Sequence, residues 1–494
     1  MKRALLLVLL CALGLPVAVV AGFYGFENWT GHQAWRQVEL ALREKGESLS
    51  IEAFLPAPVP DHENMASAPV FRELFLKPAT AGVNAVRMPI GKSAHREEDP
   101  VVVKLARRFQ ADFSGDPVSA SEVIFEGLAP MASTLDEVAS AASRPSAVWP
   151  VNPDLGFDVA MPFLSPLRQT SEVLRARALA SLAVGQPDSA LVDFQLIVRL
   201  AQRANQPPVL IGCLAEQAIV GNALDVVQEG INQRAWSDEH LERIDAALAE
   251  LRPLESLRLS IRGERALFLR SSDDLIDRAA PFFTFVDFRN KTSEWVTRTL
   301  SQIVWDLRPS GWRELDRANY ARLSQEWLNL VIHNDFIRPW ALAEFNDRMR
   351  SLCRSGLGSF RTPLTALAIP TFATAARRAA YMQTRLDLAR IAGAIERQRL
   401  ATGGIPESLD ELSPRWIEQV PRDVIAGGRY FYRVDDDGGF VIYGKGWNGR
   451  DDGGRVGTIN SIVGPSSADD WVWACSPPAG EPLANVVSPG RGAR

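Results

Sequence analysis

The most prominent feature of the hydrophobic pattern is an uncharged run at the N-terminus. Lys2 and Arg3 precede it, and residues 4–26 contain no charged side chain. About 20 apolar residues suffice for a helix to cross the hydrocarbon of a bilayer. Because basic residues that flank such a run stay on the cytoplasmic side, we expect a transmembrane helix within residues 1–26, with the rest of the chain beyond the membrane.

A cleavable signal peptide is the alternative interpretation of this run. Val19, Val20 and Ala21 offer a tolerable cleavage site. The uncharged stretch is, however, longer than the apolar segment of about 7 to 15 residues that signal peptides usually carry. Its length favours an uncleaved anchor, and both interpretations place the bulk of the chain outside the cytoplasm.

The residues that follow the run alternate between short helical patterns and prolines. Trp35, Val38 and Leu42 recur at helical spacing, and they predict a short amphipathic helix over residues 34–46. Beyond it the prolines interrupt regular structure. We therefore expect residues 27–160 to form a mixed, proline-rich region next to the membrane.

Helical periodicity dominates residues 161–377, which we predict to be a helical domain. Gly185, Ala190 and Phe194 have the spacing of the two-helix hairpin in tetratricopeptide repeats, where small residues let the helices approach closely. A second copy does not follow at the repeat distance of about 34 residues. Since a solenoid needs several stacked repeats, a single helical hairpin is the favoured interpretation.

Residues 236–251 carry a complete set of helix signals. Ser237 is a typical N-cap, and acidic residues occupy the first turn. The side chains expected on the buried face are Leu241, Ile244, Leu248 and Leu251.

The C-terminal region combines a helix with a β-hairpin. Residues 378–404 form an amphipathic pattern that ends at a Gly-Gly pair. The β-forming segments 429–434 and 440–446 flank the turn DDDGG, which is typical of a hairpin. We therefore expect an α+β domain over residues 378–476 and a flexible tail over 477–494. The predicted fold class is α+β, and mostly α-helical.

Composition and charge exclude several classes of protein. The chain is 46% hydrophobic and 23% charged, which is ordinary for a globular protein. Its 54 basic and 59 acidic residues give 54 − 59 = −5. Because no run of Lys or Arg accompanies this balance, we expect no nucleic-acid partner.

Local catalytic and metal-binding motifs are missing from the sequence. Cys213, Cys353 and Cys475 are too widely spaced for a disulfide framework or a zinc knuckle, and we expect Cys213 and Cys353 to be buried. The five histidines are scattered. Aromatic residues crowd residues 281–345, where packing between helices is the favoured role and a partner surface remains open.

A glycine-rich loop, YGKGWNGRDDGG, spans residues 443–454. A phosphate-binding loop is excluded, because the preceding residues are a strand and Gly446 stands where Ser or Thr would bind Mg²⁺. A metal-binding loop and a metal-free turn both remain.

The order of elements in residues 378–475 resembles a known family. A long helix, IPESLDEL, Pro-Arg-Asp, an aromatic hairpin, the glycine-rich loop and DDWVW follow one another. This order is similar to the C-terminal globular part of type II secretion pseudopilins, and more specifically to pseudopilin-like tails on exported bacterial proteins of planctomycete and verrucomicrobial type. In major pseudopilins the loop after the hairpin holds a structural calcium ion.

By position, the resemblance implies a set of oxygen ligands for calcium, which suit this ion. These residues are Asn448, Asp451, Asp452, Asp469 and Asp470. Two features depart from the family. Asn448 is neutral where an acid would bind more strongly, and the apolar helix that lets pseudopilins polymerise lies far upstream of this domain. Filament formation is therefore not implied.

These observations favour a non-enzymatic interaction or scaffold protein. We expect it to be anchored in the bacterial cell membrane by a single pass, with its bulk on the periplasmic side and with a protein partner. The alternative is an exported hydrolase whose dispersed active site lies in residues 50–160 or 280–345.

Overall fold

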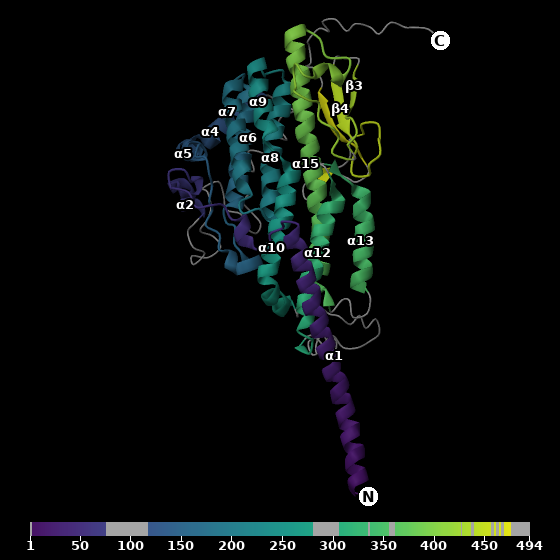
Figure 1. Ribbon diagram of the computed structural model, residues 1–494. Coiled ribbons are helices and arrows are strands. Elements are labelled where there is room, and N and C mark those ends of the chain that lie inside the picture. The colour runs from purple at the N-terminus through teal and green to yellow at the C-terminus, as the bar shows by residue number, and fades with distance from the viewer. Residues whose placement is uncertain are drawn as a thin grey trace, which may run out of the picture.

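The computed structural model describes most of the chain and shows a mostly α-helical protein (Figure 1). The described residues also form three small antiparallel sheets, the largest with three strands. The described residues are 2–75, 117–279, 306–333, 336–354, 361–425, 427–435, 439–455, 459–460, 464–465 and 469–475.

The α-helices of the described residues lie between Lys2 and Thr402. Their bounds are α1 (Lys2–Glu44), α2 (Pro69–Phe75), α4 (Pro117–Leu128), α5 (Ala132–Ala142), α6 (Leu164–Ala183), α7 (Pro187–Ala204), α8 (Leu210–Asn232), α9 (Asp238–Ala249), α10 (Pro253–Ala279), α12 (Gly311–Val331), α13 (Pro339–Arg354) and α15 (Pro363–Thr402). The strands are β1 (Ile332–His333), β2 (Phe336–Ile337), β3 (Phe431–Val434), β4 (Phe440–Gly444), β5 (Ile459–Asn460), β6 (Gly464–Pro465) and β7 (Trp471–Cys475).

The helix α1 contains both the N-terminal uncharged run and the segment that follows it. Residues 34–44 are helical, as predicted, and Gly46 has φ = 74° just beyond the helix end. They continue the helix of the uncharged run instead of forming a short helix of their own, so no break falls at the expected boundary between residues 26 and 27. The residues between the two patterns include no proline, so the helix continues through them.

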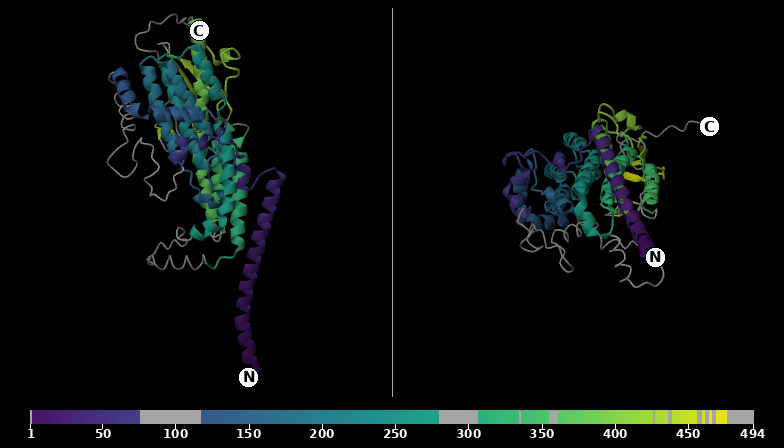
Figure 2. Two further views of the ribbon diagram at one scale, coloured as in Figure 1. Left: turned by 90° about the vertical axis from the view of Figure 1, so that its left-hand side faces the viewer. Right: turned by 60° about the horizontal axis from the view of Figure 1, so that its bottom comes forward.

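The surroundings of α1 change along its length. Every residue from 14 to 23 is exposed. From Glu27 onward one face is covered, and the buried positions Glu27, Gly31 and Leu42 recur at helical spacing. Figure 2 shows the N-terminal half of α1 standing clear of the body, while its C-terminal half lies along the bundle.

The covered half of α1 packs against α12 at very short range. A Cβ atom added at Gly31 would lie 1.9 Å from the carbonyl oxygen of Gly311, and one added at Gly311 would lie 2.4 Å from the carbonyl oxygen of Glu27. The two backbones can approach this closely because neither position carries a side chain. Asn28 joins them as well, since its Oδ1 accepts a hydrogen bond of 2.8 Å from the Gly311 N–H.

The predicted helical hairpin is present as α6 and α7. Gly185 joins the two helices with φ = 73°, a conformation that favours glycine. Ala190 and Phe194 are fully buried. The prediction for α9 is also confirmed, because the Ser237 hydroxyl accepts the His240 N–H and the four predicted side chains are buried.

The helix α8 lies at the centre of the bundle, in contact with α6, α7, α10 and α15. By length and composition α8 is apolar enough to cross a membrane, as the core helices of soluble proteins can also be. More than half of its most apolar window is buried by these neighbours. A helix with apolar side chains over most of its surface is expected in such a core position.

The helix α15 belongs to two hydrophobic cores. Its first half, with Phe372 and Ala376, packs with α10, α12 and α13. Its second half, with Leu388 and Ile395, packs with α6 to α9. The helix begins at Pro363, so it is longer than the predicted helix over residues 378–404, and the expected domain boundary at residue 377 falls inside it.

The predicted hairpin is confirmed as β3 and β4, which pair antiparallel from Phe431 opposite Tyr443 to Val434 opposite Phe440. A third strand, β7, pairs with the other side of β4. The sheet packs on α15, with Trp473 in one core and Trp471 in the other. The C-terminal region therefore shares both cores with the helical region.

The predictions for cysteines and aromatic residues are tested in part. Cys213 is fully buried, as expected, whereas the side chain of Cys353 lies outside the described residues. Within residues 281–345, Trp312 and Trp327 are buried between helices and Trp340 is exposed. The other aromatic residues before position 306 lie outside the described part.

The close approach of α1 and α12 yields a first prediction. We expect Gly31→Ala to lower the free energy of unfolding by about 1–3 kcal/mol, because the added methyl group forces the helices apart. Gly25→Ala is the matched control, since a Cβ there meets nothing within 4 Å. Denaturant unfolding in detergent micelles measures both. Equal stability of the two variants would contradict the packing described here.

Candidate functional site

The glycine-rich loop lies at one end of the three-stranded sheet. In the antiparallel pair of β4 and β7, Gly444 at the end of β4 is opposite Trp471 at the start of β7. The loop that leaves β4 therefore meets the residues that lead into β7. A Cβ atom at Gly446 would lie 1.8 Å from the carbonyl oxygen of Asp469, so this approach requires glycine.

Asp470 is the buried centre of this region. Its side chain is 3% exposed. One carboxylate oxygen, Oδ2, accepts the N–H groups of Asp452 at 2.9 Å and Gly454 at 2.8 Å. The other oxygen, Oδ1, is buried and has no hydrogen-bond partner among the described residues. Burial raises the pKa of Asp470, and the two N–H groups oppose that rise.

The side chains of the other residues implied by the resemblance lie nearby, but each of their hydrogen bonds is to a group other than the Asp470 side chain. Asn448 donates to Asp452 at 2.8 Å. Asp451 is exposed, and its Oδ1 accepts the Gly453 N–H. Asp469 accepts a hydrogen bond of 3.1 Å from Arg455.

The residues around Asp470 meet only some of the requirements of a calcium site. Oδ1 of Asp470 is an oxygen ligand without a partner, as calcium would need. However, no group of three or more His, Cys, Asp or Glu side chains could hold a metal ion within the described ranges. The loop also directs N–H groups, which bind anions, at the Asp470 carboxylate. These contacts favour the metal-free turn, and calcium binding stays a prediction from the resemblance.

Asp423 supports the same loop from the opposite side, and it was not singled out as a site residue from the sequence. It is 1% exposed, and its carboxylate accepts the N–H groups of Ile425 at 2.9 Å and Lys445 at 2.8 Å. Burial raises its pKa to about 6, and the charge of Asp470 contributes to the rise. Asp423 ends the Pro-Arg-Asp segment, and this was the feature of the sequence that could have identified it.

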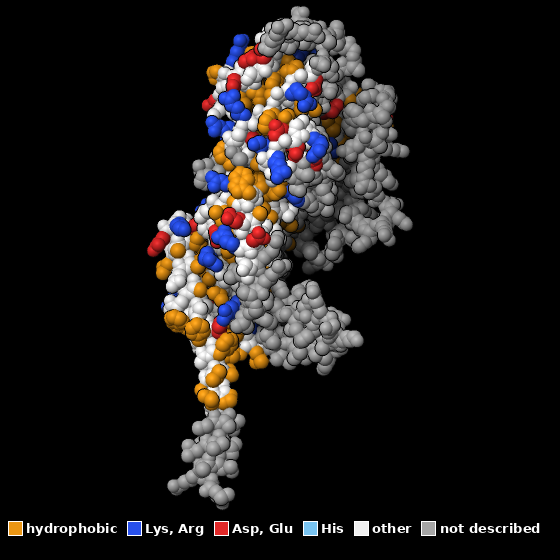
Figure 3. Space-filling model, turned by 90° about the vertical axis from the view of Figure 1, so that its right-hand side faces the viewer, with side chains coloured by type: hydrophobic (Ala, Val, Ile, Leu, Met, Phe, Trp, Pro, Cys, Tyr) orange, Lys and Arg blue, Asp and Glu red, His pale blue; other side chains and the backbone are white. Residues whose placement is uncertain are grey.

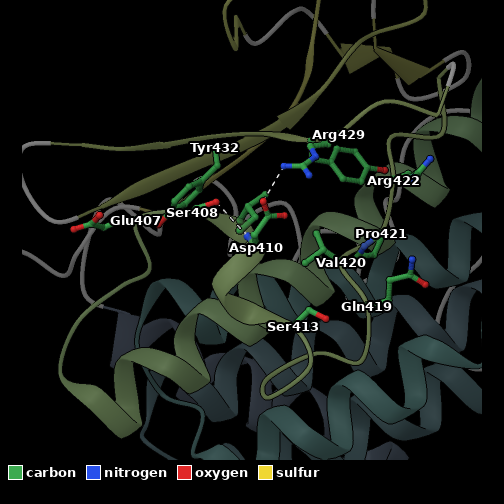
Figure 4. A pocket seen from close by; sticks show the side chains of 12 residues that line it. Glu407, Ser408, Asp410, Ser413, Gln419, Val420, Pro421, Arg422, Arg429 and Tyr432 are labelled. Carbon is green, nitrogen blue, oxygen red and sulfur yellow. Dashed lines mark hydrogen bonds and ion pairs between the residues drawn. The ribbon is translucent and has the colours of Figure 1, made fainter.

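Two cavities adjoin the C-terminal region on either side of residues 419–422. The larger, of about 720 Å³, lies between α10, α15 and this segment. The smaller, of about 380 Å³, lies between this segment, the start of β3 and residues 407–413. Figure 4 shows the smaller cavity, with the ion pair of Arg429 and Asp410 among the residues that line it.

A buried hydrogen bond separates the two cavities. Asp387 of α15 lines the larger cavity, and Tyr430 lines the smaller one. The Tyr430 hydroxyl donates to Asp387 Oδ2 at 2.8 Å, and Gln383 donates to Oδ1 at 2.9 Å. Burial raises the pKa of Asp387 to about 7. Both carboxylate oxygens thus have partners, which is typical of a structural bond between the sheet and the helix.

The serines that line the smaller cavity are also used structurally. The Ser408 hydroxyl accepts the Asp410 N–H and caps the short 3₁₀ helix Leu409–Leu412. The Ser413 hydroxyl donates to the Glu418 carbonyl. The Glu411 carboxylate accepts the backbone N–H of Ser408 and not its hydroxyl, whereas nucleophilic catalysis requires a base that contacts the hydroxyl.

One group of Ser, His and Asp side chains does come together, at the start of α9. His240 Nε2 lies 2.9 Å from Asp188 Oδ1. The Ser237 hydroxyl, however, accepts the backbone N–H of His240, and the Ser237 N–H donates to the ring at Nδ1. The imidazole therefore does not contact the hydroxyl that it would have to activate. This group is a helix cap.

Cys213 is a free thiol in the interior of the helical bundle. It is fully buried in the bundle, and burial raises its pKa to about 12. A thiol in this environment stays protonated and is unreactive.

Comparison of the chain with family models, with curated proteins and with solved structures gave no match.

The role of Asp470 can be tested by truncation. We expect Asp470→Ala to lower the free energy of unfolding by about 1–3 kcal/mol, because two partly buried N–H groups lose their acceptor. Asp451→Ala is the control, since Asp451 is exposed and accepts one N–H. Calorimetric titration of the wild-type chain with Ca²⁺ tests the metal site that the resemblance implies. Saturable heat that disappears in Asp470→Ala would show a calcium site, and no saturable heat in the wild type would leave the metal-free turn.

The buried carboxyl group of Asp387 predicts a pH dependence. An aspartate in the unfolded chain titrates near pH 3.9, so between about pH 4 and pH 7 the folded chain holds a proton that the unfolded chain has released. Stability from this group is therefore complete below about pH 4 and is lost as the pH rises through 7.

We expect Asp387→Asn to reduce this decline in stability, because the amide does not titrate. Denaturant unfolding at several pH values measures it. Asp410→Asn, which changes an exposed carboxylate, serves as the control. The same slope with pH in the Asp387→Asn variant and in the wild type would contradict the assignment.

Proposed function

We propose that the protein is a membrane-anchored interaction or scaffold protein, with its helical body exposed in the bacterial envelope on the periplasmic side. The N-terminal part of α1 would cross the membrane once. The observation that carries this proposal is the exposure of apolar side chains on all sides of α1 before the helix reaches the body.

Four apolar side chains of this part of α1 are largely exposed. Leu15, Val17, Val19 and Val20 are between 55% and 68% exposed. At 3.6 residues per turn they point to different sides of the helix, so one packed neighbour could not cover them. An apolar helix surface of this kind is expected in contact with lipid.

The comparison with α8 strengthens this argument. Both segments are apolar, but α8 is surrounded by four helices of the bundle. The run in α1 has no such cover over residues 14–22. The bilayer would supply the apolar environment that neighbouring helices supply to α8.

A non-enzymatic role is supported by the structural roles of the side chains that could otherwise be reactive. Ser237 and His240 cap α9, Asp188 contacts the His240 ring, and Cys213 is buried and protonated. Asp387 joins the sheet to α15. The exposed Trp340 on α13 is the kind of side chain that anchors protein partners.

Topology can be tested with reporters fused after residue 494. We expect alkaline phosphatase to be active in this position and green fluorescent protein to be dark, because the C-terminus would lie in the periplasm. We also expect the protein to stay in the membrane pellet after carbonate extraction. A fluorescent fusion, or a full-length chain in the soluble fraction, would contradict the proposal.

A matched variant separates anchoring from export. When a cleavable signal peptide replaces residues 1–26, we expect the body to reach the periplasm and to fractionate as a soluble protein. Retention of that body in the carbonate-washed pellet would show that the run in α1 is not what holds the protein in the membrane.

A further inference from the structure

The body of the protein begins to contact α1 before the uncharged run has ended. The ring of Phe23 lies edge-on to Trp312, with 6.4 Å between centroids. The Tyr24 hydroxyl donates to the carbonyl oxygen of Leu307. Both residues belong to the run that ends at Phe26, so no linker separates the run from the body.

The length of the run fixes how close the body comes to the bilayer. At 1.5 Å per residue, a helix over residues 4–26 is about 34 Å long, and the hydrocarbon of a bilayer is about 30 Å thick. If the run spans the hydrocarbon, residues 23–26 lie at its outer boundary. The end of the body that touches Phe23 and Tyr24 must then lie at the level of the lipid headgroups.

The side chains at this end of the body suit that position. Phe26, Trp29 and Leu307 are each at least 60% exposed. Figure 3 shows hydrophobic side chains gathered where α1 leaves the body. Aromatic residues, and Trp above all, are enriched at the headgroup level of membrane proteins, where an apolar ring and a polar edge are both accommodated.

The first charge after the run is neutralised by the body. Glu27 is 4% exposed, and its carboxylate accepts the indole N–H of Trp312 at 2.7 Å and pairs with Arg361. A free carboxylate at the edge of the hydrocarbon would favour water and keep the body away from the lipid. With Glu27 paired, this end of the body can approach the bilayer.

We propose that the base of the body, formed by Phe23, Tyr24, Phe26, Trp29 and Leu307, binds the headgroup region of the phospholipid bilayer. The inference rests on the proposed anchoring by α1 and adds a second lipid contact to it. The body then stands directly on the membrane in one orientation, with the C-terminal end of α15 and the three-stranded sheet directed away from the lipid (Figure 1).

Hydroxyl-radical footprinting of the wild-type chain in phospholipid nanodiscs tests this proposal without substitutions. Trp29 and Trp340 form a matched pair, because they are 62% and 55% exposed and have the same intrinsic reactivity. Leu307 and Leu400 form a second pair, at 62% and 43%. Leu15 reports insertion of the run.

We expect Trp29 to be oxidised several-fold more slowly than Trp340, and Leu307 several-fold more slowly than Leu400, because lipid covers one member of each pair. Leu15 can be protected while the two members of each pair are oxidised in proportion to their exposed fractions. In that case the base does not touch the bilayer and the proposal is overturned, although the anchoring by α1 stands. Oxidation of Leu15 would overturn the anchor itself, and the proposal with it.

Discussion

Glu27 is buried where α1 meets α12, and Trp312 and Arg361 hold its carboxylate there. Removal of one partner from such a pair leaves an uncompensated buried charge, which costs about 3–5 kcal/mol. The backbone contact of Gly31 with Gly311 lies one turn further along the same helix. Together these contacts fix the direction in which α1 leaves the body, and every inference about membrane orientation depends on that direction.

A second carboxylate holds the other end of the packed half of α1. Glu47, just beyond the helix, accepts hydrogen bonds from Arg262 at 2.8 Å and from the buried Arg265 at 2.5 Å. Because Arg262 and Arg265 belong to α10, α1 is attached to the bundle at two separated points. The long helix α15 then connects both hydrophobic cores and carries the sheet. Through these contacts, α1, α10, α15 and the sheet form one connected body, so the place of α1 determines where the sheet lies.

Local patterns in the sequence predicted the elements that local interactions determine. The Ser237 cap of α9 and the β3–β4 hairpin were recognisable because each depends on residues close in sequence. The pairing of β7 with β4 was not predicted, since the two strands are far apart in the sequence, with β5 and β6 between them. The same reason applies to the bond between Asp387 and Tyr430 and to the role of Asp423: a buried acid is recognisable only when its distant partners are known. The continuity of α1 was missed because two different hydrophobic patterns follow one another on a single helix.

Whether α1 stays intact in the mature protein decides the central claim most directly. The intact mass of the protein extracted from the membranes of its host measures this. The account predicts a chain that retains the uncharged run, close to the full 54.3 kDa, in the membrane fraction. A mature chain that starts after Ala21 and is recovered from the soluble periplasm would contradict it.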